Sequence, residues 1–226
     1  MKIYFFLTTY LISIYFLNEY LRKMGLMKSN TGFVHQLFAN NSVPLSGGLF
    51  IILPVLFFFY NFSFVFLFSY TFLFILGILS DLNILIKVKL RFFLQLLIVS
   101  IFVFITELQV LPTRIDIIDD NLSGTDISLI FTIFCLLILI NGSNFIDGLN
   151  GLFIGYVLII FFIILKLDLF LELGEQKNLK EIELIYFVGI LIFLYLVNLS
   201  NKLFLGDSGT YSLSFLIGVV LIKIYN

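Results

Sequence analysis

The sequence is dominated by long runs that contain no charged residue. No Asp, Glu, Lys or Arg occurs from Ser29 to Ser80. Shorter uncharged runs are Ile3–Asn18, Phe92–Thr106, Ile127–Ile146, Gly148–Leu165, Leu184–Asn201 and Ser208–Ile222. A helix needs about 20 apolar residues, or about 17 at the least, to cross a bilayer. The runs therefore predict membrane-spanning helices.

The first run is too long for one helix. The polar residues Asn40 to Ser42 and a turn at Asn61 divide it, so we expect spans at Val43–Tyr60 and Phe62–Leu79. The sequence thus predicts an all-α polytopic membrane protein with about eight spans. Barrel strands would alternate apolar and polar residues, which these runs do not. No small-residue cleavage site follows the first run, so we expect it to be an uncleaved span.

The composition excludes several other classes of protein. Hydrophobic residues make up 61% of the chain and charged residues 12%, about half the charged share of a soluble domain. This excludes a soluble domain, a disordered chain and a basic nucleic-acid-binding surface. The single cysteine, Cys135, cannot form an intrachain disulfide and is expected to serve as a packing residue.

The positive charges indicate which side of the membrane each loop faces. The loops Glu19–Ser42, Ser80–Arg91, Asn141–Asn150 and Ser200–Thr210 fall on one side of an eight-span chain. They include the tight cluster Lys87, Lys89 and Arg91. Lys and Arg in short loops favour the cytoplasmic side, so we place these four loops in the cytoplasm.

Three acids in these loops are candidates for function. Asp81, Asp147 and Asp207 each lie in a segment rich in Gly or Asn, at the end of a different helical hairpin. One acid at the end of a span is usually a solvated cap, but three on the same side are unexpected because charges near the membrane are costly. Mg²⁺ commonly joins one or two carboxylates to substrate phosphates. The three acids therefore predict a site for a metal ion and a phosphate.

Other residues in the same loops suit a phosphate-bearing ligand. Glycines that open helices leave backbone N–H groups free for anions, and the candidates are Gly47, Gly48, Gly148, Gly151 and Gly209. Asn141 and Asn144 offer amides to a base or a sugar. Lys89, with its two basic neighbours, could attract a lipid head group or a nucleotide.

The longest of these segments resembles a known family motif. Asn141-x-x-Asn144-x-x-Asp147-Gly148-x-x-Gly151-Leu152 is similar to the central motif of the polyprenyl-phosphate N-acetylhexosamine-1-phosphate transferases, glycosyl transferase family 4. Three further segments agree with the family in order and spacing: His35 with Pro44-x-x-Gly47-Gly48, Gly77-x-x-Ser80-Asp81 with Lys89 and Gln95, and Phe204-x-Gly206-Asp207-x-Gly209. The resemblance covers nearly the whole chain.

The resemblance implies a reaction and a set of site residues. The family moves N-acetylhexosamine-1-phosphate from a UDP-sugar to undecaprenyl phosphate and releases UMP. It requires Mg²⁺ or Mn²⁺ and works at the cytoplasmic face of the bacterial inner membrane. The implied catalytic residues are Asp81, Asp147 and Asp207, of which Asp207 and Asp147 would bind the metal. The implied substrate-binding residues are Asn141, Asn144, Gly148, His35, Gly47, Gly48 and Lys89.

The chain also departs from the family pattern. Ser80 stands where the family has the first Asp of an Asp-Asp pair, and Asn150 stands where it has a later Asp. Gln36 and Leu37 follow His35, where relatives carry a cation. The chain ends before the family's His-rich loop and last spans, so we expect residues 1–226 to form a single, C-terminally short domain.

Two motifs favour one branch of the family. Pro44-Leu-Ser-Gly-Gly48 and Asn144-Phe-Ile-Asp-Gly148 resemble the GlcNAc-1-phosphate transferases. This branch implies a UDP-N-acetylhexosamine donor and a role in cell-envelope polysaccharide synthesis. A homodimer is left open.

Alternatives to the transferase reading come from other classes of protein. Ser80 and the missing His-rich loop favour a non-catalytic relative that binds polyprenyl phosphate or a partner protein. An intramembrane aspartyl protease would need Gly at position 204, where the chain has Phe. A CDP-alcohol phosphotransferase would need later paired Asp residues, and the sequence has none.

Overall fold

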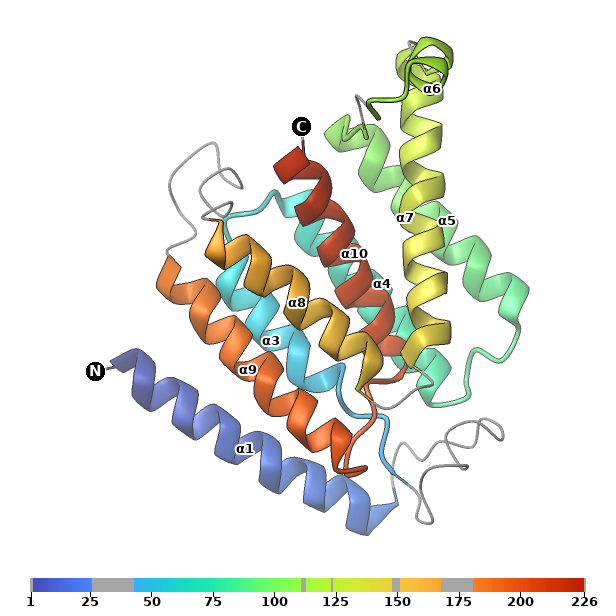
Figure 1. Cartoon of the computed structure of the whole chain (residues 1–226). Coiled ribbons are helices and arrows are strands. Elements are labelled where there is room, and N and C mark those ends of the chain that lie inside the picture. Colours follow the sequence, from blue (N-terminus) through green and yellow to red (C-terminus); the bar gives the residue numbers. More distant parts are fainter. Residues whose placement is uncertain are drawn as a thin grey trace.

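The chain forms a bundle of α-helices (Figure 1). The computed structural model describes residues 2–25, 43–110, 113–122, 124–147, 151–167 and 181–225. The helices are α1 (Lys2–Met24), α3 (Leu49–Phe58), α4 (Phe64–Asp81), α5 (Val88–Thr106), α6 (Asp116–Asn121), α7 (Thr125–Asp147), α8 (Leu152–Lys166), α9 (Glu181–Leu199) and α10 (Gly206–Tyr225). No strand occurs in these residues. The predicted all-α class is confirmed.

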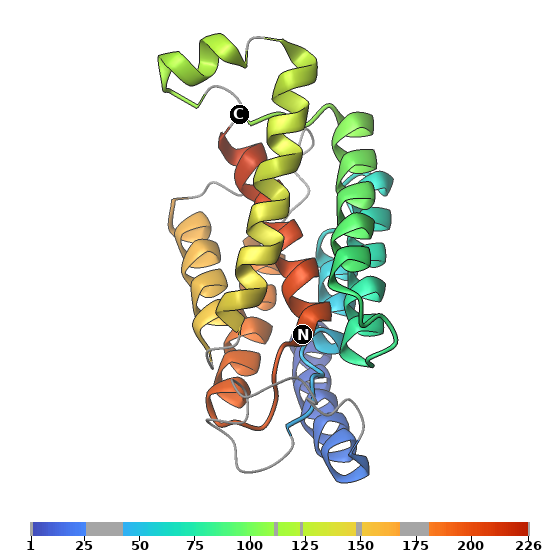
Figure 2. The same cartoon turned by 90° about the vertical axis from the view of Figure 1, so that its right-hand side faces the viewer.

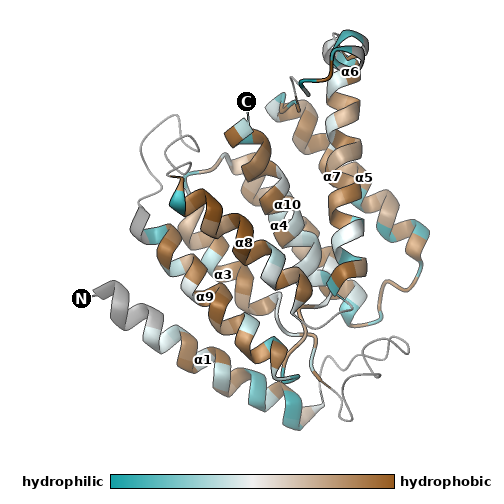
Figure 3. Cartoon of the chain, in the orientation of Figure 1, coloured by the Kyte–Doolittle hydropathy of each residue, from teal (hydrophilic) through white to brown (hydrophobic). Residues whose placement is uncertain are grey.

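The lengths of the helices fit a membrane protein. Four of them, α4, α5, α7 and α10, are long and apolar enough to cross a membrane. The apolar helices α3 and α8 are shorter, and so is the apolar segment Glu183–Leu199 of α9. Apolar residues run along most of the helices, and hydrophilic residues gather mainly near their ends (Figure 3). Each of the eight predicted spans overlaps a helix, but the number of eight crossings stays a prediction.

Helix α10 lies at the centre of the bundle (Figures 1 and 2). It packs mainly against α4 and α7 and also contacts α3 and α8. Nearly all of its side chains are buried, from Ser208 to Val220. Large aromatic residues fill the core beside it: the Phe215 ring lies 5.7 Å from that of Phe66 and 4.9 Å from that of Phe102. This central position lets the first turn of α10 meet residues of several other helices.

Small residues allow α10 to approach its neighbours closely. A Cβ atom added to Gly77 of α4 would clash with the backbone of Ser208. Two hydroxyl groups of α10 bond within the helix: Ser212 donates to the Ser208 carbonyl at 2.6 Å, and Ser214 donates to the Thr210 carbonyl at 2.6 Å. Small residues at helix interfaces are typical of membrane proteins, because van der Waals contact drives their packing.

The second predicted span has the wrong boundaries. We expected a helix from Val43 to Tyr60, but α3 covers only Leu49–Phe58. The segment Val43–Gly48 instead pairs with the chain before α10. Gly47 N–H donates to the Phe204 carbonyl at 3.0 Å, and the Phe204 N–H donates to that of Pro44 at 3.0 Å. These bonds to a distant segment replace the first turns of the expected helix.

The described parts of the loops predicted for one side of the membrane lie at one end of the bundle. Asn18 of α1 donates to the Lys202 carbonyl at 2.9 Å and accepts from the Ser46 hydroxyl at 2.9 Å. The end of α4, the start of α5, the end of α7 and the start of α10 meet at this same end of the bundle (Figure 1). Short α6 lies at the opposite end. All the candidate acids therefore fall at one end.

Candidate active site

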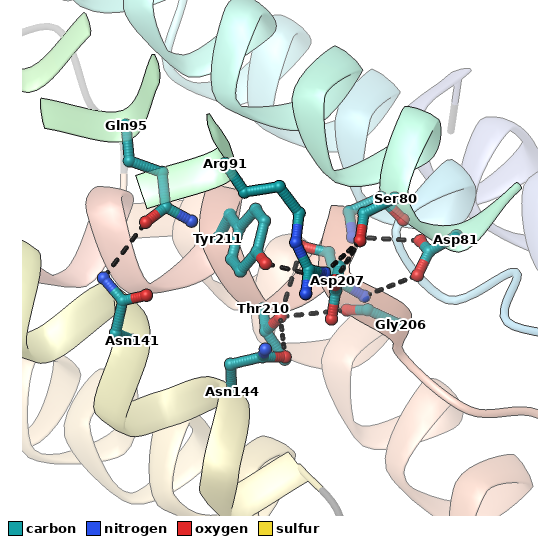
Figure 4. Close-up of polar contacts among 11 residues, drawn as sticks. Ser80, Asp81, Arg91, Gln95, Asn141, Asn144, Gly206, Asp207, Thr210 and Tyr211 are labelled. Atoms are coloured by element: carbon teal, nitrogen blue, oxygen red, sulfur yellow. Dashed lines mark hydrogen bonds and ion pairs between the residues drawn. The ribbon is translucent and has the colours of Figure 1, made fainter. Parts of the chain in front are cut away.

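Asp81, Asp147 and Asp207 come together at the first turn of α10. Asp81 is the last residue of α4, Asp147 the last of α7 and Asp207 the second of α10. Asp81 and Asp147 are only 5% and 8% exposed. Figure 4 shows Asp81 and Asp207 facing each other beside Gly206. Three helix ends thus deliver one carboxylate each to the same place, as the loop positions predicted.

Asp81 holds the start of α10. Its Oδ1 accepts from the Asp207 backbone N–H at 2.8 Å, and its Oδ2 accepts from the Ser208 N–H at 3.0 Å. The first N–H groups of a helix have no partner within the helix, and a carboxylate also interacts favourably with the helix dipole there. Both oxygens of Asp81 are therefore engaged in capping α10, which is a positioning role.

Gly206 makes this cap possible. Its φ of +76° lies in the left-handed region, which favours glycine because it has no Cβ atom. A Cβ atom at this position would lie 2.7 Å from the Asp81 Oδ2. The Gly-Asp pair of the sequence motif is therefore explained by the close approach of Asp81 to the backbone.

Asp207 forms the polar centre of the site. Its Oδ2 accepts from Arg91 Nη1 at 2.6 Å, from the Ser80 hydroxyl at 2.5 Å and from the Tyr211 hydroxyl at 3.1 Å. Arg91 Nη1 also contacts Ser80 Oγ. Within the part of the chain that the structure describes, no donor bonds Asp207 Oδ1. One carboxylate oxygen is thus occupied and the other is available.

Asp147 adds a third carboxyl group next to the first turn of α10. Its carboxylate interacts with the Gly206 backbone N–H and lies within electrostatic range of Asp81 and Asp207. Among the described residues, Arg91 forms an ion pair at this centre. Three carboxyl groups thus share a poorly solvated place with one paired guanidinium, and unpaired charge is costly there.

This donor set suits a hard divalent cation. The available groups are carboxylate, amide and hydroxyl oxygens, which Mg²⁺ prefers. The described residues contain no cluster of three or more His, Cys, Asp or Glu that forms a metal cage by itself. Mg²⁺ often takes only one or two carboxylates, with phosphates and water completing its shell. Asp207 and Asp147 are two carboxylate residues of the kind that such a smaller site would use.

Asn141 and Asn144 lie on a helix and not in the loop that we expected. Because α7 continues to Asp147, positions 141, 144 and 147 repeat at about one turn and share a face. Asn144 Oδ1 accepts from the Thr210 hydroxyl at 3.2 Å. Asn141 Nδ2 donates to Gln95 Oε1 at 3.0 Å and to the Leu137 carbonyl at 2.9 Å. Asn144 therefore borders the acidic centre, and Asn141 lies deeper in the bundle.

Gln95, which the sequence analysis named only as part of a motif, is a buried residue of α5. It is 1% exposed, and among the described residues its Nε2 has no hydrogen-bond partner. Its Oε1 accepts the bond from Asn141 noted above. The amide pair links α5 to α7 beneath the acidic centre (Figure 4).

The expectation that Gly47 and Gly48 present free N–H groups to an anion is not met in this structure. Gly48 N–H donates to the Leu205 carbonyl at 3.0 Å, as Gly47 N–H does to that of Phe204. A Cβ atom at Gly47 would lie 2.7 Å from Leu205 Cα. Both glycines therefore allow two chain segments to pack closely, and their N–H groups are already bonded.

Three predicted substrate-binding residues are not among those shown at the acidic centre. Lys89 is exposed in the first turn of α5 and is not among the residues that bond Asp207. His35 and Gly148 lie outside the described residues. Their expected roles in substrate binding stay predictions.

Arg91 and Tyr211 are site residues that the sequence did not single out. The sequence grouped Arg91 with Lys87 and Lys89 as a basic cluster that could attract a lipid head group or a nucleotide. Of these three residues, Arg91 is the one shown to bond Asp207. Tyr211 follows Asp207 by one helical turn, so its position could have been inferred had α10 been predicted to begin at Gly206. Nothing in the sequence distinguishes Arg91 from its two basic neighbours.

Comparison with known proteins agrees with this arrangement. The family model for glycosyl transferase family 4 matches residues 63–225, which include every residue of the acidic centre. A search of curated proteins found no match. The chain therefore belongs to glycosyl transferase family 4, whose members transfer a phospho-sugar to polyprenyl phosphate.

Proposed function

We propose that the protein transfers N-acetylhexosamine-1-phosphate from a UDP-sugar to undecaprenyl phosphate, giving polyprenyl-diphosphate-sugar and UMP. The observation that carries the proposal is the meeting of Asp81, Asp147 and Asp207 at the first turn of α10 in a member of this family. The reaction would be the first membrane step of a cell-envelope polysaccharide pathway.

The main difficulty of this reaction is electrostatic. A phosphate oxygen of the lipid must attack the β-phosphorus of an anionic nucleotide sugar, and the bond to the leaving UMP must break. Enzymes that transfer phosphoryl groups work mostly by positioning the reactants and neutralising charge. Mg²⁺ or Mn²⁺, when bound, would supply that neutralisation for the diphosphate and for UMP. The acceptor phosphate is already ionised near neutral pH, so no separate general base is required.

Each acid would have a distinct part in this chemistry. Asp207 Oδ1 and the Asp147 carboxylate would hold the cation, because the described residues do not fully use either group. Asp81 would keep the first turn of α10 in place, since both of its oxygens bond that turn. Asp81 would therefore affect the reaction indirectly, by holding Asp207 in position.

The remaining predicted residues would bind the substrates. Asn144 is half-buried beside Thr210, and its amide nitrogen could donate to a sugar or base oxygen. Asn141, which is tied to Gln95, would support that face of α7. We retain Lys89, His35 and Gly148 as proposed contacts for the phosphates.

The donor and the location also belong to the proposal. The segment Asn144-Phe-Ile-Asp-Gly148 supports a UDP-N-acetylhexosamine of the GlcNAc type as donor. The basic cluster Lys87, Lys89 and Arg91 supports a bacterial inner membrane with the acidic centre facing the cytoplasm.

Transfer of label tests the proposal directly. Membranes containing the chain would be given undecaprenyl phosphate, Mg²⁺ and UDP-N-acetylhexosamines carrying a radioactive β-phosphate. We expect the label to enter the lipid phase and unlabelled UMP to appear in equal amount. Label remaining in water with every donor would count against the proposal, and label in the lipid without UMP would indicate a different reaction.

A non-catalytic relative is the rival function, and Ser80 is the observation that favours it. Ser80 replaces an acid of the family and bonds Asp207 at 2.5 Å. Such a protein would bind polyprenyl phosphate without releasing UMP. Binding of the lipid together with no turnover, under conditions where a known family enzyme is active, would support this rival.

A further inference from the structure

Helix α1 carries a buried asparagine on the face that contacts the bundle. The helix lies at the edge of the bundle beside α9 (Figure 1). Ile14 and Asn18 are only 1% and 3% exposed, whereas Ser13 and residues 15–17 are exposed. Residues four positions apart share a face of a helix. Asn18 therefore ends an apolar contact face, where an amide without hydrogen bonds would be costly.

Asn18 joins two segments that are far from it in the sequence. Its Nδ2 donates to the Lys202 carbonyl at 2.9 Å, and its Oδ1 accepts from the buried Ser46 hydroxyl at 2.9 Å. An amide suits this position because it carries a donor and an acceptor on one short side chain. Ser46 precedes α3 and Lys202 precedes α10, so one residue of α1 connects both segments.

The segments that Asn18 joins also pair with each other. The Gly47 N–H donates to the Phe204 carbonyl, and the Gly48 N–H donates to that of Leu205. A small apolar cluster reinforces this pairing, and its members are Val43, Leu45 and Phe204. Leu205 directly precedes the turn at Gly206, so the paired segments lead straight into α10.

The segment that contains Ser46 also touches the first turn of α10 directly. A Cβ atom at Gly48 would clash with the Ser208 hydroxyl and with the Gly209 backbone. Asp207 immediately precedes these two residues, and its backbone N–H donates to Asp81. Two elements therefore hold this turn: the end of α4, through Asp81, and the segment that Asn18 fixes to α1.

We propose that Asn18 is a positioning residue for the acidic centre. By fixing Ser46 and the Lys202 carbonyl to α1, it holds the turn before α10 in place, and with it the Asp207 carboxylate that would bind the cation. The inference rests on the proposed function for the identity of that cation. It makes α1 part of the support of the centre, although α1 lies outside residues 63–225, which the family model matches.

Hydrogen exchange in two variants tests the connection. Asn18→Leu removes both hydrogen bonds at similar side-chain volume. Ser46→Ala removes one of them, and it decides the question if the first variant does not fold. We expect the Gly48 and Asp207 amides to exchange about two- to tenfold faster in each variant, the factor that corresponds to the net contribution of a hydrogen bond.

Ser13→Ala is the matched control on the same helix. The exposed Ser13 hydroxyl donates to a carbonyl of its own helix at 2.7 Å, so its removal should leave exchange at Asp207 unchanged. Unchanged exchange at Asp207 in the Asn18 and Ser46 variants would overturn the proposal. This holds even with faster exchange at Gly48, because Asn18 would then fix the segments without positioning the acid.

Binding of Mn²⁺ separates a positioning role from a general effect on stability. Electron paramagnetic resonance would follow the loss of the free Mn²⁺ signal as protein in detergent is added. We expect Asn18→Leu to bind Mn²⁺ about tenfold more weakly, at the lower end of the range for residues that orient metal ligands. Phe187→Leu is the control for stability, because Phe187 is buried in the aromatic core against Phe59 and Phe161. It should lower the thermal midpoint and leave the affinity for Mn²⁺ unchanged.

The outcomes distinguish this inference from the proposed function. Unchanged affinity in Asn18→Leu, or an equal loss in Phe187→Leu, would contradict the positioning role. An unaltered chain that binds no Mn²⁺ would count against the cation of the proposed function, and exchange at Asp207 would still decide the role of Asn18.

Discussion

Asp81 accepts hydrogen bonds from the backbone of the helix that carries Asp207, with 2.8 Å between its Oδ1 and the Asp207 nitrogen. The two acids of the motif are thus not equivalent. One carboxylate fixes the backbone, and the other is held by side chains from α4, α5 and α10 with one oxygen left available. Because the two carboxylates have different roles, substitutions of Asp81 and Asp207 should have different effects.

Replacing Asp81 should loosen the first turn of α10. In Asp81→Asn, an NH2 group must face one of the two backbone N–H donors, so a buried hydrogen bond is lost. We expect the free energy of unfolding to fall by about 1–3 kcal/mol, with faster hydrogen exchange at the Asp207 and Ser208 amides. The matched control is Asp116→Asn in exposed α6, which should change neither quantity. Unchanged exchange at Asp207 in the Asp81 variant would refute the capping role.

Gly206 should tolerate no side chain. Gly206→Ala places a Cβ atom at a positive φ and 2.7 Å from Asp81 Oδ2. Backbone strain of this kind costs about 1–3 kcal/mol, and we expect a lower thermal midpoint in detergent. Gly189→Ala in α9 is the control, because nothing lies within 4 Å of the added atom and alanine favours helix formation. Equal destabilisation by both substitutions would show that the turn at Gly206 is not special.

Gln95 and Asn141 should be energetically coupled. The single variants Gln95→Ala and Asn141→Ala and their double variant form a mutant cycle for the 3.0 Å amide bond. Hydrogen bonds between membrane helices contribute about 0.6 kcal/mol on average, and we expect a coupling energy of about that size in unfolding experiments. Additive effects of the two substitutions would mean that the bond contributes nothing to stability.

The acidic centre should face the cytoplasm. A reporter fused after Lys89 stands at the start of α5, at the end of the bundle where α4 ends and α10 begins. One fused after Asp120 stands in α6, at the opposite end (Figure 1). We expect the first to report a cytoplasmic location and the second a periplasmic one. The reverse result would invert the topology, and with it the access of the site to a cytoplasmic nucleotide sugar.

The sequence predicted the long helices because bilayer crossing depends on apolar length alone. The expected spans Phe62–Leu79 and Phe92–Thr106 lie largely within α4 and α5. The expected loop Asn141–Asn150 was placed too early, because the polar residues from Asn141 to Asp147 continue α7. In these cases side-chain hydrogen bonds to other helices satisfy the polar groups, and hydropathy does not register such bonds.

The site was only partly predictable for the same physical reason. The spacing of the motifs and the positions of the loops were sufficient to predict that Asp81, Asp147 and Asp207 lie at one end of the bundle. They could not show that the N–H groups of Gly47 and Gly48 bond Phe204 and Leu205, because that pairing joins segments far apart in the chain. They could not separate Arg91 from Lys87 and Lys89 either, since the difference lies in where each side chain points.

The most direct test of the account compares UMP release by Asp207→Asn and Asp116→Asn with that of the unaltered chain. Both substitutions remove one carboxylate charge, but only Asp207 bonds Arg91, Ser80 and Tyr211 at the acidic centre. With UDP-GlcNAc, undecaprenyl phosphate and Mg²⁺, we expect Asp116→Asn to retain the rate and Asp207→Asn to lose at least about a hundredfold, typical for removing a charge-stabilising group. Equal rates in the two variants would contradict the central claim.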